Sequence, residues 1–333
     1  MSRKFYKDTD SGKWESDFAV APTDVFGSAM LEYLNVLDPF FSKAQEKCEF
    51  EFILCLLRFT GMRDAGWDPF ENLLDVYEGF QRIHATNIED ELKAHYALFM
   101  YGLILEASAP YEMLANLMNV IEGNRYSIQN FKDYKDSVTG RIRSLSPADK
   151  AAQLKSRAKK LRLSLALFDE FSDNALRNGI FHSDYSIYWP EIRIRNPDKR
   201  YSHQEWMGLV NRSFAYLSAL EHLYYGFVRT YSEPELIEPH PEFKHHQDEK
   251  VTTIVRQGYG LVGIKDNWTK EQVVAGFIPY RVGLFLPYEI PLVEQGILKL
   301  PSNKIEKFNK RIKYLPRIFK EVCCKEVCWE LRC

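Results

Sequence analysis

The sequence predicts a mainly α-helical protein with a smaller mixed α/β region at its C-terminal end. Between residues 24 and 230, apolar side chains recur at the three- to four-residue spacing of amphipathic helices, with glycine, proline and polar turns between the periodic segments. After residue 231 the chain is rich in proline, glutamate and histidine, and residues 251–264 are then β-branched and glycine-rich. With 333 residues, of which 45% are hydrophobic and 14% aromatic, the chain can bury a sizeable core.

The expected elements follow in chain order from these signals. Residues 1–22 are polar and predict a flexible arm, and the apolar spacing that begins at Asp24 predicts a helix that Pro39 interrupts. The further expected helices are 46–59, 72–83, 88–105, 111–122, 151–175 and 204–230, with an extended segment at 187–194 and a turn at 196–198. The resulting domains are the arm 1–22, a helical domain 23–231, a linker 232–250 and a small α/β domain 251–333, with helices expected at 270–277 and 304–331 and only short strands between them.

The helix expected over residues 151–175 has a clear start. Ser146 can cap it, Pro147 suits the first helical turn, and Asp149 suits the positive end of the helix dipole. Apolar residues at Leu154, Leu161, Leu165, Leu167 and Phe168 continue the pattern, so we expect one helix that leads into the next segment.

That next segment, Arg177-Asn178-Gly179-Ile180-Phe181-His182, contains the residue types of acid–base chemistry. Asn178 and His182 share a face of a regular helix, and the long side chain of Arg177 can curl toward the histidine. Arginine offers a planar fork of donors to a phosphate, histidine transfers a proton near neutral pH, and asparagine can orient either group. The set therefore predicts metal-free phosphodiester cleavage, whereas the competing interpretation is that Arg177 and His182 only stabilise a helix C-terminus.

These six residues resemble the R-x(4–6)-H signature of the HEPN superfamily, in its common form with asparagine directly after arginine. The surroundings are similar too: an apolar approach at 165–171, an acidic residue and an aromatic at Asp184 and Tyr185, and a long closing helix at 204–230. Gly179 departs from the alanine that is frequent at this place in the family. The resemblance implies an antiparallel helical bundle that often dimerises near the motif, and in many members a metal-independent endoribonuclease of toxin, antiphage or RNA-processing systems.

Carried over by position, the resemblance implies that Arg177 binds the scissile phosphate, His182 is the general acid or base, and Asn178 orients the pair. The nucleophile is the 2′-hydroxyl of the RNA, so no cofactor or metal is expected. The expected partners are RNA, a second copy of the chain and, in a toxin or defence system, an antitoxin or defence partner protein. Two alternatives remain open: a non-catalytic HEPN-like module that binds nucleic acid or protein, and a helical scaffold unrelated to the family.

A basic stripe precedes the motif, with eight lysines and arginines against one acid over residues 141–162, although the whole chain has a net charge of −2. That overall charge excludes a uniformly basic nucleic-acid coat and makes a local patch the only route to RNA. Within the stripe we expect Arg157, Lys159 and Lys160 to bind RNA, although a solvated helix face explains the same pattern. Residues 299–325 repeat the basic pattern, with Tyr314 and Phe319 interleaved, and are a second candidate.

Other site classes have weak support in the sequence. His240, His245 and His246 lie in the expected linker without a fixed scaffold for a metal, and the glycines of Gly258-Tyr259-Gly260 precede no helix that would make a dinucleotide site. The six cysteines form no Cys-x-x-Cys pair, so we expect reduced thiols and no metal. The longest apolar run, 96–105, is too short to span a membrane, and the start of the chain has no apolar signal segment, which together predict a cytoplasmic protein.

Overall fold

The computed structural model describes residues 5–17, 23–60, 69–127, 130–135, 137, 140–241 and 250–266. The chain divides into two compact units, Met1–Phe59 with Pro69–Val228, and Thr60–Asp68 with Arg229–Cys333. The described residues are mainly helical, as the sequence predicts, and they also form a few small antiparallel sheets. None of the helices in these ranges is long and apolar enough to cross a membrane.

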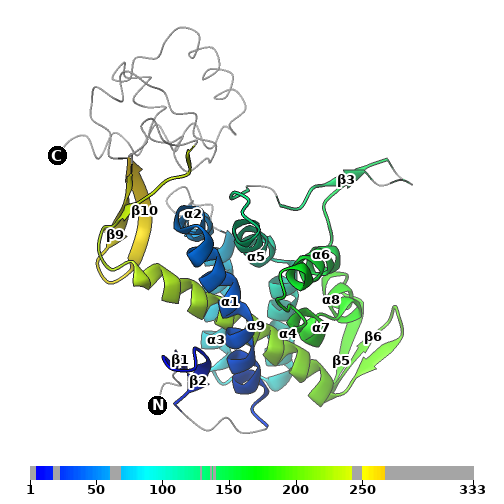
Figure 1. Cartoon of the computed structure of the whole chain (residues 1–333). Coiled ribbons are helices and arrows are strands. Elements are labelled where there is room, and N and C mark those ends of the chain that lie inside the picture. Colours follow the sequence, from blue (N-terminus) through cyan, green and yellow to red (C-terminus); the bar gives the residue numbers. More distant parts are fainter. Residues whose placement is uncertain are drawn as a thin grey trace, which may run out of the picture. The chain divides into compact units, whose positions relative to one another are not determined.

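The helices of the first unit pack around one another in a bundle (Figure 1). Helix α1 packs against α5, α5 against α6, α3 against α4, and α4 against α8. The helices are α1 (Val25–Lys47), α2 (Glu49–Thr60), α3 (Pro69–His84), α4 (Asp90–Glu106), α5 (Ser108–Ile121), α6 (Pro147–Lys160), α7 (Leu167–Phe171), α8 (Asn174–Phe181) and α9 (His203–Thr230).

Aromatic contacts join the long helix α9 to three other helices. The rings of Phe41 in α1 and Phe227 in α9 stack with centroids 5.3 Å apart. Tyr77 of α3 meets Phe214 at 5.3 Å, and Phe171 of α7 stacks on Tyr216 at 5.1 Å. Each buried aromatic side chain contributes about 1.5–3 kcal/mol by leaving water, so these contacts hold α9 against α1, α3 and α7.

Two helix boundaries differ from the prediction. Pro39 was expected to interrupt the first helix, but it lies inside α1, which continues to Lys47. An internal proline costs about 3 kcal/mol. The residues that follow it, Phe40, Phe41 and Ala44, are fully buried, and their burial offsets that cost.

The single helix expected over residues 151–175 is wrong. The Ser146 cap is confirmed, since its hydroxyl accepts the Asp149 N–H at 3.2 Å, but α6 ends at Lys160 and two short helices, α7 and α8, follow. Arg162 adopts a left-handed conformation with φ of 58°. The Leu163 N–H donates to the Ala158 carbonyl at 2.9 Å, which completes a Schellman turn. Arginine instead of glycine occupies the turn position, so the sequence carries no visible stop.

A three-stranded antiparallel sheet follows α8, in the order β5-β6-β7, and contains the extended segment that the sequence predicts at 187–194. Its strands are β5 (Tyr185–Tyr188), β6 (Glu191–Ile194) and β7 (Lys199–Tyr201). Ile192 and Ile194 of β6 are buried, and the Trp206 indole N–H of α9 donates to the Pro190 carbonyl at 3.0 Å between β5 and β6. A second ribbon pairs β3 (Tyr134–Lys135) with β4 (Ile142–Arg143).

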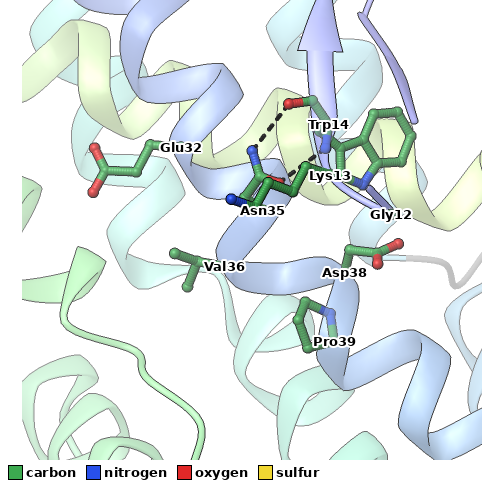
Figure 2. A pocket seen from close by; sticks show the side chains of 8 residues that line it. All are labelled: Gly12, Lys13, Trp14, Glu32, Asn35, Val36, Asp38 and Pro39. Atoms are coloured by element: carbon green, nitrogen blue, oxygen red, sulfur yellow. Dashed lines mark hydrogen bonds between the residues drawn. The ribbon is translucent and has the colours of Figure 1, made fainter. Parts of the chain in front are cut away.

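Part of the expected N-terminal arm forms a hairpin, β1 (Phe5–Lys7) with β2 (Trp14–Ser16). Two contacts hold it on α1: the Trp14 N–H donates to Asn35 Oδ1 at 2.9 Å, and Lys7 Nζ lies 2.6 Å from the buried Asp38 carboxylate. Figure 2 shows the pocket of about 550 Å³ between the hairpin and α1. These side-chain anchors lie 21 and 31 positions further along the chain than their partners, and local sequence patterns do not reveal such contacts.

The described residues of the second unit form an antiparallel sheet in the order β10-β9-β8. Its strands are β8 (Leu236–Ile237), β9 (Val251–Arg256) and β10 (Gly260–Asp266), so the predicted strands at 251–264 are confirmed, and two residues of the expected linker join them. Gly258 and Gly260 have φ of +77° and +107° in the hairpin turn, which explains their glycines. The elements expected at 270–277, 277–300 and 304–331 lie outside the described residues.

Candidate functional site

The motif lies on α8, and Asp173 fixes the start of this helix. One carboxylate oxygen of Asp173 accepts the Leu176 N–H at 3.0 Å and the Tyr201 hydroxyl at 2.9 Å, and the other accepts Lys199 Nζ at 2.7 Å. Burial opposes ionisation of Asp173, but these hydrogen bonds outweigh it and hold its pKa below the usual value. Asp173 therefore caps α8 and ties it to β7 through residues that lie 26 and 28 positions further on.

Two glycines let α8 approach its neighbours closely. A Cβ at Gly179 would lie 2.5 Å from Ile194 Cδ1 of β6, and a Cβ at Gly102 of α4 would lie 2.9 Å from a ring carbon of Phe181. Packing against Ile194 therefore favours a residue without a Cβ at position 179, and the HEPN pattern alone does not show this. The sites of close approach place α8 between α4 and β6.

The end of α8 is a second Schellman turn. Ser183 has φ of 56°, the Ser183 N–H donates to the Ile180 carbonyl at 3.2 Å, and the Asp184 N–H donates to the Gly179 carbonyl at 2.9 Å. His182 is the C-cap residue, with φ of −91° and ψ of 0°. Its side chain is exposed and makes no hydrogen bond, ion pair or ring contact with any residue that the structure describes.

Arg177 has the opposite environment. Its side chain is only 13% exposed, and its Nη1 lies 2.6 Å from Glu106 Oε1 at the end of α4. Its Nη2 donates to Asn178 Oδ1 at 2.7 Å, while its Nε is buried without a hydrogen-bond partner. The structure therefore joins Arg177 and Asn178 directly, and the side chain of His182, five positions on, makes no hydrogen bond, ion pair or ring contact with either of them or with any other described residue.

Three residues of α4 that the sequence did not indicate as site residues contact α8 or β5, the strand after it. Glu106 pairs with Arg177, the ring of Phe99 meets Phe181 with centroids 6.5 Å apart, and His95 Nδ1 lies 2.8 Å from the Tyr185 hydroxyl. The signal was present in part, because Glu106 is the acid that ends the apolar run 96–105. Nothing in the sequence indicated which cation it would meet.

The basic stripe separates into paired and unpaired residues. Lys150 is buried and donates to Ser108 Oγ at 2.8 Å, and Arg157 lies 2.9 Å from Glu122 and donates to Asn119 at 2.8 Å. Lys159 and Lys160 are exposed, and neither side chain has a partner among the described residues. Of the three residues expected to bind RNA, two thus present free charge, and Arg157 shares its charge with an acid.

Among the described residues no group of three or more histidine, cysteine or acidic side chains is placed to hold a metal ion. His245, His246 and the four cysteines from Cys323 onward lie outside the described residues. No family model, curated protein or solved structure matches this chain. The class that fold and site define is therefore a mainly helical protein in which a buried arginine and an exposed histidine occupy one short helix and its C-cap.

Proposed function

We propose that the protein is a metal-independent endoribonuclease of the HEPN type that acts in a toxin or antiphage defence system in the cytoplasm. The observation that carries the proposal is the exposed His182, which has no partner among the described residues, at the C-cap of the helix that also bears the Arg177–Asn178 pair. A general acid or base has to be accessible to substrate, and a histidine with no structural partner has no evident role in stability.

The chemistry follows from the donors that each residue offers. Arg177 provides a guanidinium for the scissile phosphate, and the hydrogen bond to Asn178 fixes its orientation. His182 transfers the proton of the reaction, in which the RNA 2′-hydroxyl attacks the neighbouring phosphorus and displaces the 5′-oxygen. The products are a 2′,3′-cyclic phosphate and a 5′-hydroxyl end. To receive the phosphate, Arg177 exchanges one bond with the Glu106 carboxylate, which is 42% exposed and readily solvated.

The proposed enzyme is a homodimer that pairs through the α4–α8 apolar patch, defined as Leu92, Tyr96, Phe99 and Phe181. These large apolar side chains are between 40% and 52% exposed. Leu92, Tyr96 and Phe99 follow at four- and three-residue intervals on one face of α4, and Phe181 precedes His182. A two-fold axis at this patch brings two copies of His182 close to each other and doubles the contacts to a phosphodiester. Lys159 and Lys160 of α6 supply the charge that attracts the strand.

The test is the cleavage of single-stranded RNA by matched histidine variants. His182→Ala removes the proton carrier and is expected to slow cleavage by about 10²–10⁴-fold without lowering the melting temperature. His84→Ala, at another exposed histidine at the end of α3, is the control and is expected to retain the wild-type rate. Equal rates for the two variants would remove His182 from the mechanism.

The second candidate is a non-catalytic HEPN-like module that binds nucleic acid or a partner protein. It is favoured by one observation, the close pairing of Arg177 with Glu106, because a purely structural arginine is held in this way. Binding and cleavage measured on one protein preparation distinguish the two functions. The non-catalytic module binds RNA, or a protein such as an antitoxin, without cleaving RNA. Its His182→Ala variant binds as the wild type does.

A further inference from the structure

A pocket of about 150 Å³ has Arg177 in its lining, and its walls come from α4, α5, α6, α7 and α8. Its polar lining residues are Lys155, Asp169, Ser172, Asn174 and Arg177. The N-terminal residues of α6, Pro147 and Ala148, complete the wall. The pocket therefore shares one residue, Arg177, with the proposed active site.

Donors dominate this lining. Lys155 and Arg177 bring two positive charges from two helices, and the Nε of Arg177 is buried without a partner. The side chains of Ser172 and Asn174 are exposed and make no hydrogen bond to any other described residue. A hydroxyl, an amide, an ammonium and a guanidinium are together the donor set that an oxyanion accepts.

The two acids near the pocket do not block an anion. Lys155 pairs with Asp169, and Arg177 with Glu106, but in both pairs the acid is the more exposed partner. The exposed fractions are 34% for Lys155 against 66% for Asp169, and 13% for Arg177 against 42% for Glu106. Water can therefore solvate the carboxylates while the cations turn to another anion, and the Lys155–Asp169 pair, which is the more exposed of the two, holds only weakly.

The aromatic residues of the pocket argue against a nucleobase as its occupant. Tyr111 is 3% exposed and its ring stacks on Phe168 with centroids 5.6 Å apart and planes 19° apart. The flat ring face that a base needs is thus already covered on one side by protein and buried on the whole. A compact tetrahedral anion uses the donors without needing such a face.

We propose that this pocket binds a phosphate group, namely the backbone phosphate next to the scissile one on the same RNA strand. The proposal rests on the proposed function and deepens it, because it makes Lys155 and Asn174 substrate-positioning residues. Arg177 then contacts two successive phosphates, the scissile one and the one in this pocket. Two adjacent phosphates bound in this way set the register of the strand over His182.

The experiment measures binding of a 2′-O-methylated RNA oligomer, which cannot be cleaved, by fluorescence anisotropy over a range of salt concentrations. Lys155→Gln is expected to weaken binding about tenfold and to lower the salt dependence by about one phosphate contact. Lys43→Gln, at an exposed lysine of α1 that does not line the pocket, is the charge-matched control. Asn174→Ala, which changes no charge or ion pair, is expected to weaken binding several-fold, and Lys155→Arg is expected to restore most of it.

A second arm titrates inorganic phosphate and follows the Asn174 side-chain amide by NMR. If Lys155→Gln and Asn174→Ala both bind the oligomer as Lys43→Gln does, the RNA assignment is overturned. A phosphate-dependent amide shift that disappears in Lys155→Gln supports the pocket as a phosphate site, and its absence overturns it. Failure of the proposed function is seen separately, as wild-type protein that binds the oligomer but does not cleave unmodified RNA.

Discussion

Arg177 and His182 belong to one six-residue motif, yet the structure gives them opposite environments. Arg177 is largely buried and bound to Glu106 and Asn178, so its position depends on α4 and α8 together. His182 stands at the C-cap with an exposed side chain and no partner in the described part of the chain. The two residues should therefore respond differently to mutation. Replacing Arg177 removes contacts that stabilise the fold, whereas replacing His182 removes none.

The largest combined effect is expected at Arg177, where stability and activity fall together. Arg177→Ala leaves Glu106 and Asn178 without their partner and is expected to cost about 1–2 kcal/mol of unfolding free energy. Cleavage is expected to fall by about 10²–10³-fold, because the phosphate loses its guanidinium. Urea unfolding and RNA cleavage measured on the same sample check this. Glu106→Gln is the companion variant, and we expect it to keep the fold and to bind RNA more tightly.

Substitution of Asp173 tests how much the anchoring of α8 at its N-terminus contributes to the free energy of unfolding. Asp173→Ala removes the N-cap and the bonds from Lys199 and Tyr201, for an expected loss of about 2 kcal/mol. Because the folded-state pKa of Asp173 lies below its unfolded value of about 3.9, its contribution is complete above about pH 4 and is lost as the pH falls through the folded pKa. Unfolding free energies of wild type and Asp173→Asn from pH 6 to pH 2 check the sign: the wild type should lose its advantage on acidification.

The Gly179→Ala variant tests whether close packing of α8 against β6 limits which residue the motif can have at this position. Alanine improves helix propensity by about 1 kcal/mol, but its Cβ meets Ile194, and relieving such overpacking costs about 1–3 kcal/mol. We expect a net loss of about 1 kcal/mol and a displaced α8. The melting temperature tests this expectation. A Gly179→Ala protein that is more stable than the wild type would show that β6 can shift away from the new methyl group at no cost in free energy. The matched variant Gly208→Ala, on α9, meets only the end of the Arg212 side chain at 3.5 Å and is expected to be stabilising.

The smallest effect is expected at the two Schellman turns. Arg162→Gly and Ser183→Gly each relieve a left-handed conformation and are expected to stabilise the protein by about 0.5–1 kcal/mol. Only the second turn adjoins His182, so Ser183→Gly is expected to alter cleavage, whereas Arg162→Gly leaves it unchanged. Melting temperatures and cleavage rates of the two variants provide the check. Equal cleavage by both would mean that the turn does not position the histidine.

Local patterns predicted most of the fold. The periodicity of α1 to α5 and α9, the Ser146 cap and the strands at 251–264 could be found because propensity, spacing and packing agree there. The end of α6 could not be found, since Arg162 holds a turn position that glycine usually marks. The interruption predicted at Pro39 was wrong for the opposite reason, because burial of the residues that follow offsets the tendency of proline to end a helix.

The candidate site was predictable in residue type but not in contacts. Arg177, Asn178 and His182 lie on or at the end of one helix as their spacing indicates. Glu106, Asp173 and Lys155 acquire their roles from partners 71, 26 and 14 positions away, and no single-sequence pattern encodes such distances. The sequence showed Gly179 only as a departure from the alanine of the HEPN pattern, because the contact with Ile194 depends on a strand that follows it.

The central claim, cleavage by the RNA 2′-hydroxyl without a metal, is tested most directly with an oligonucleotide that contains one ribonucleotide in an otherwise 2′-deoxy strand. In the presence of EDTA, the wild-type protein is expected to cut only after that ribonucleotide and to leave a 2′,3′-cyclic phosphate, which mass spectrometry identifies. The all-deoxy strand is expected to stay intact. Cleavage of the all-deoxy strand, a product with a 5′-phosphate, or no product from any RNA would contradict the account.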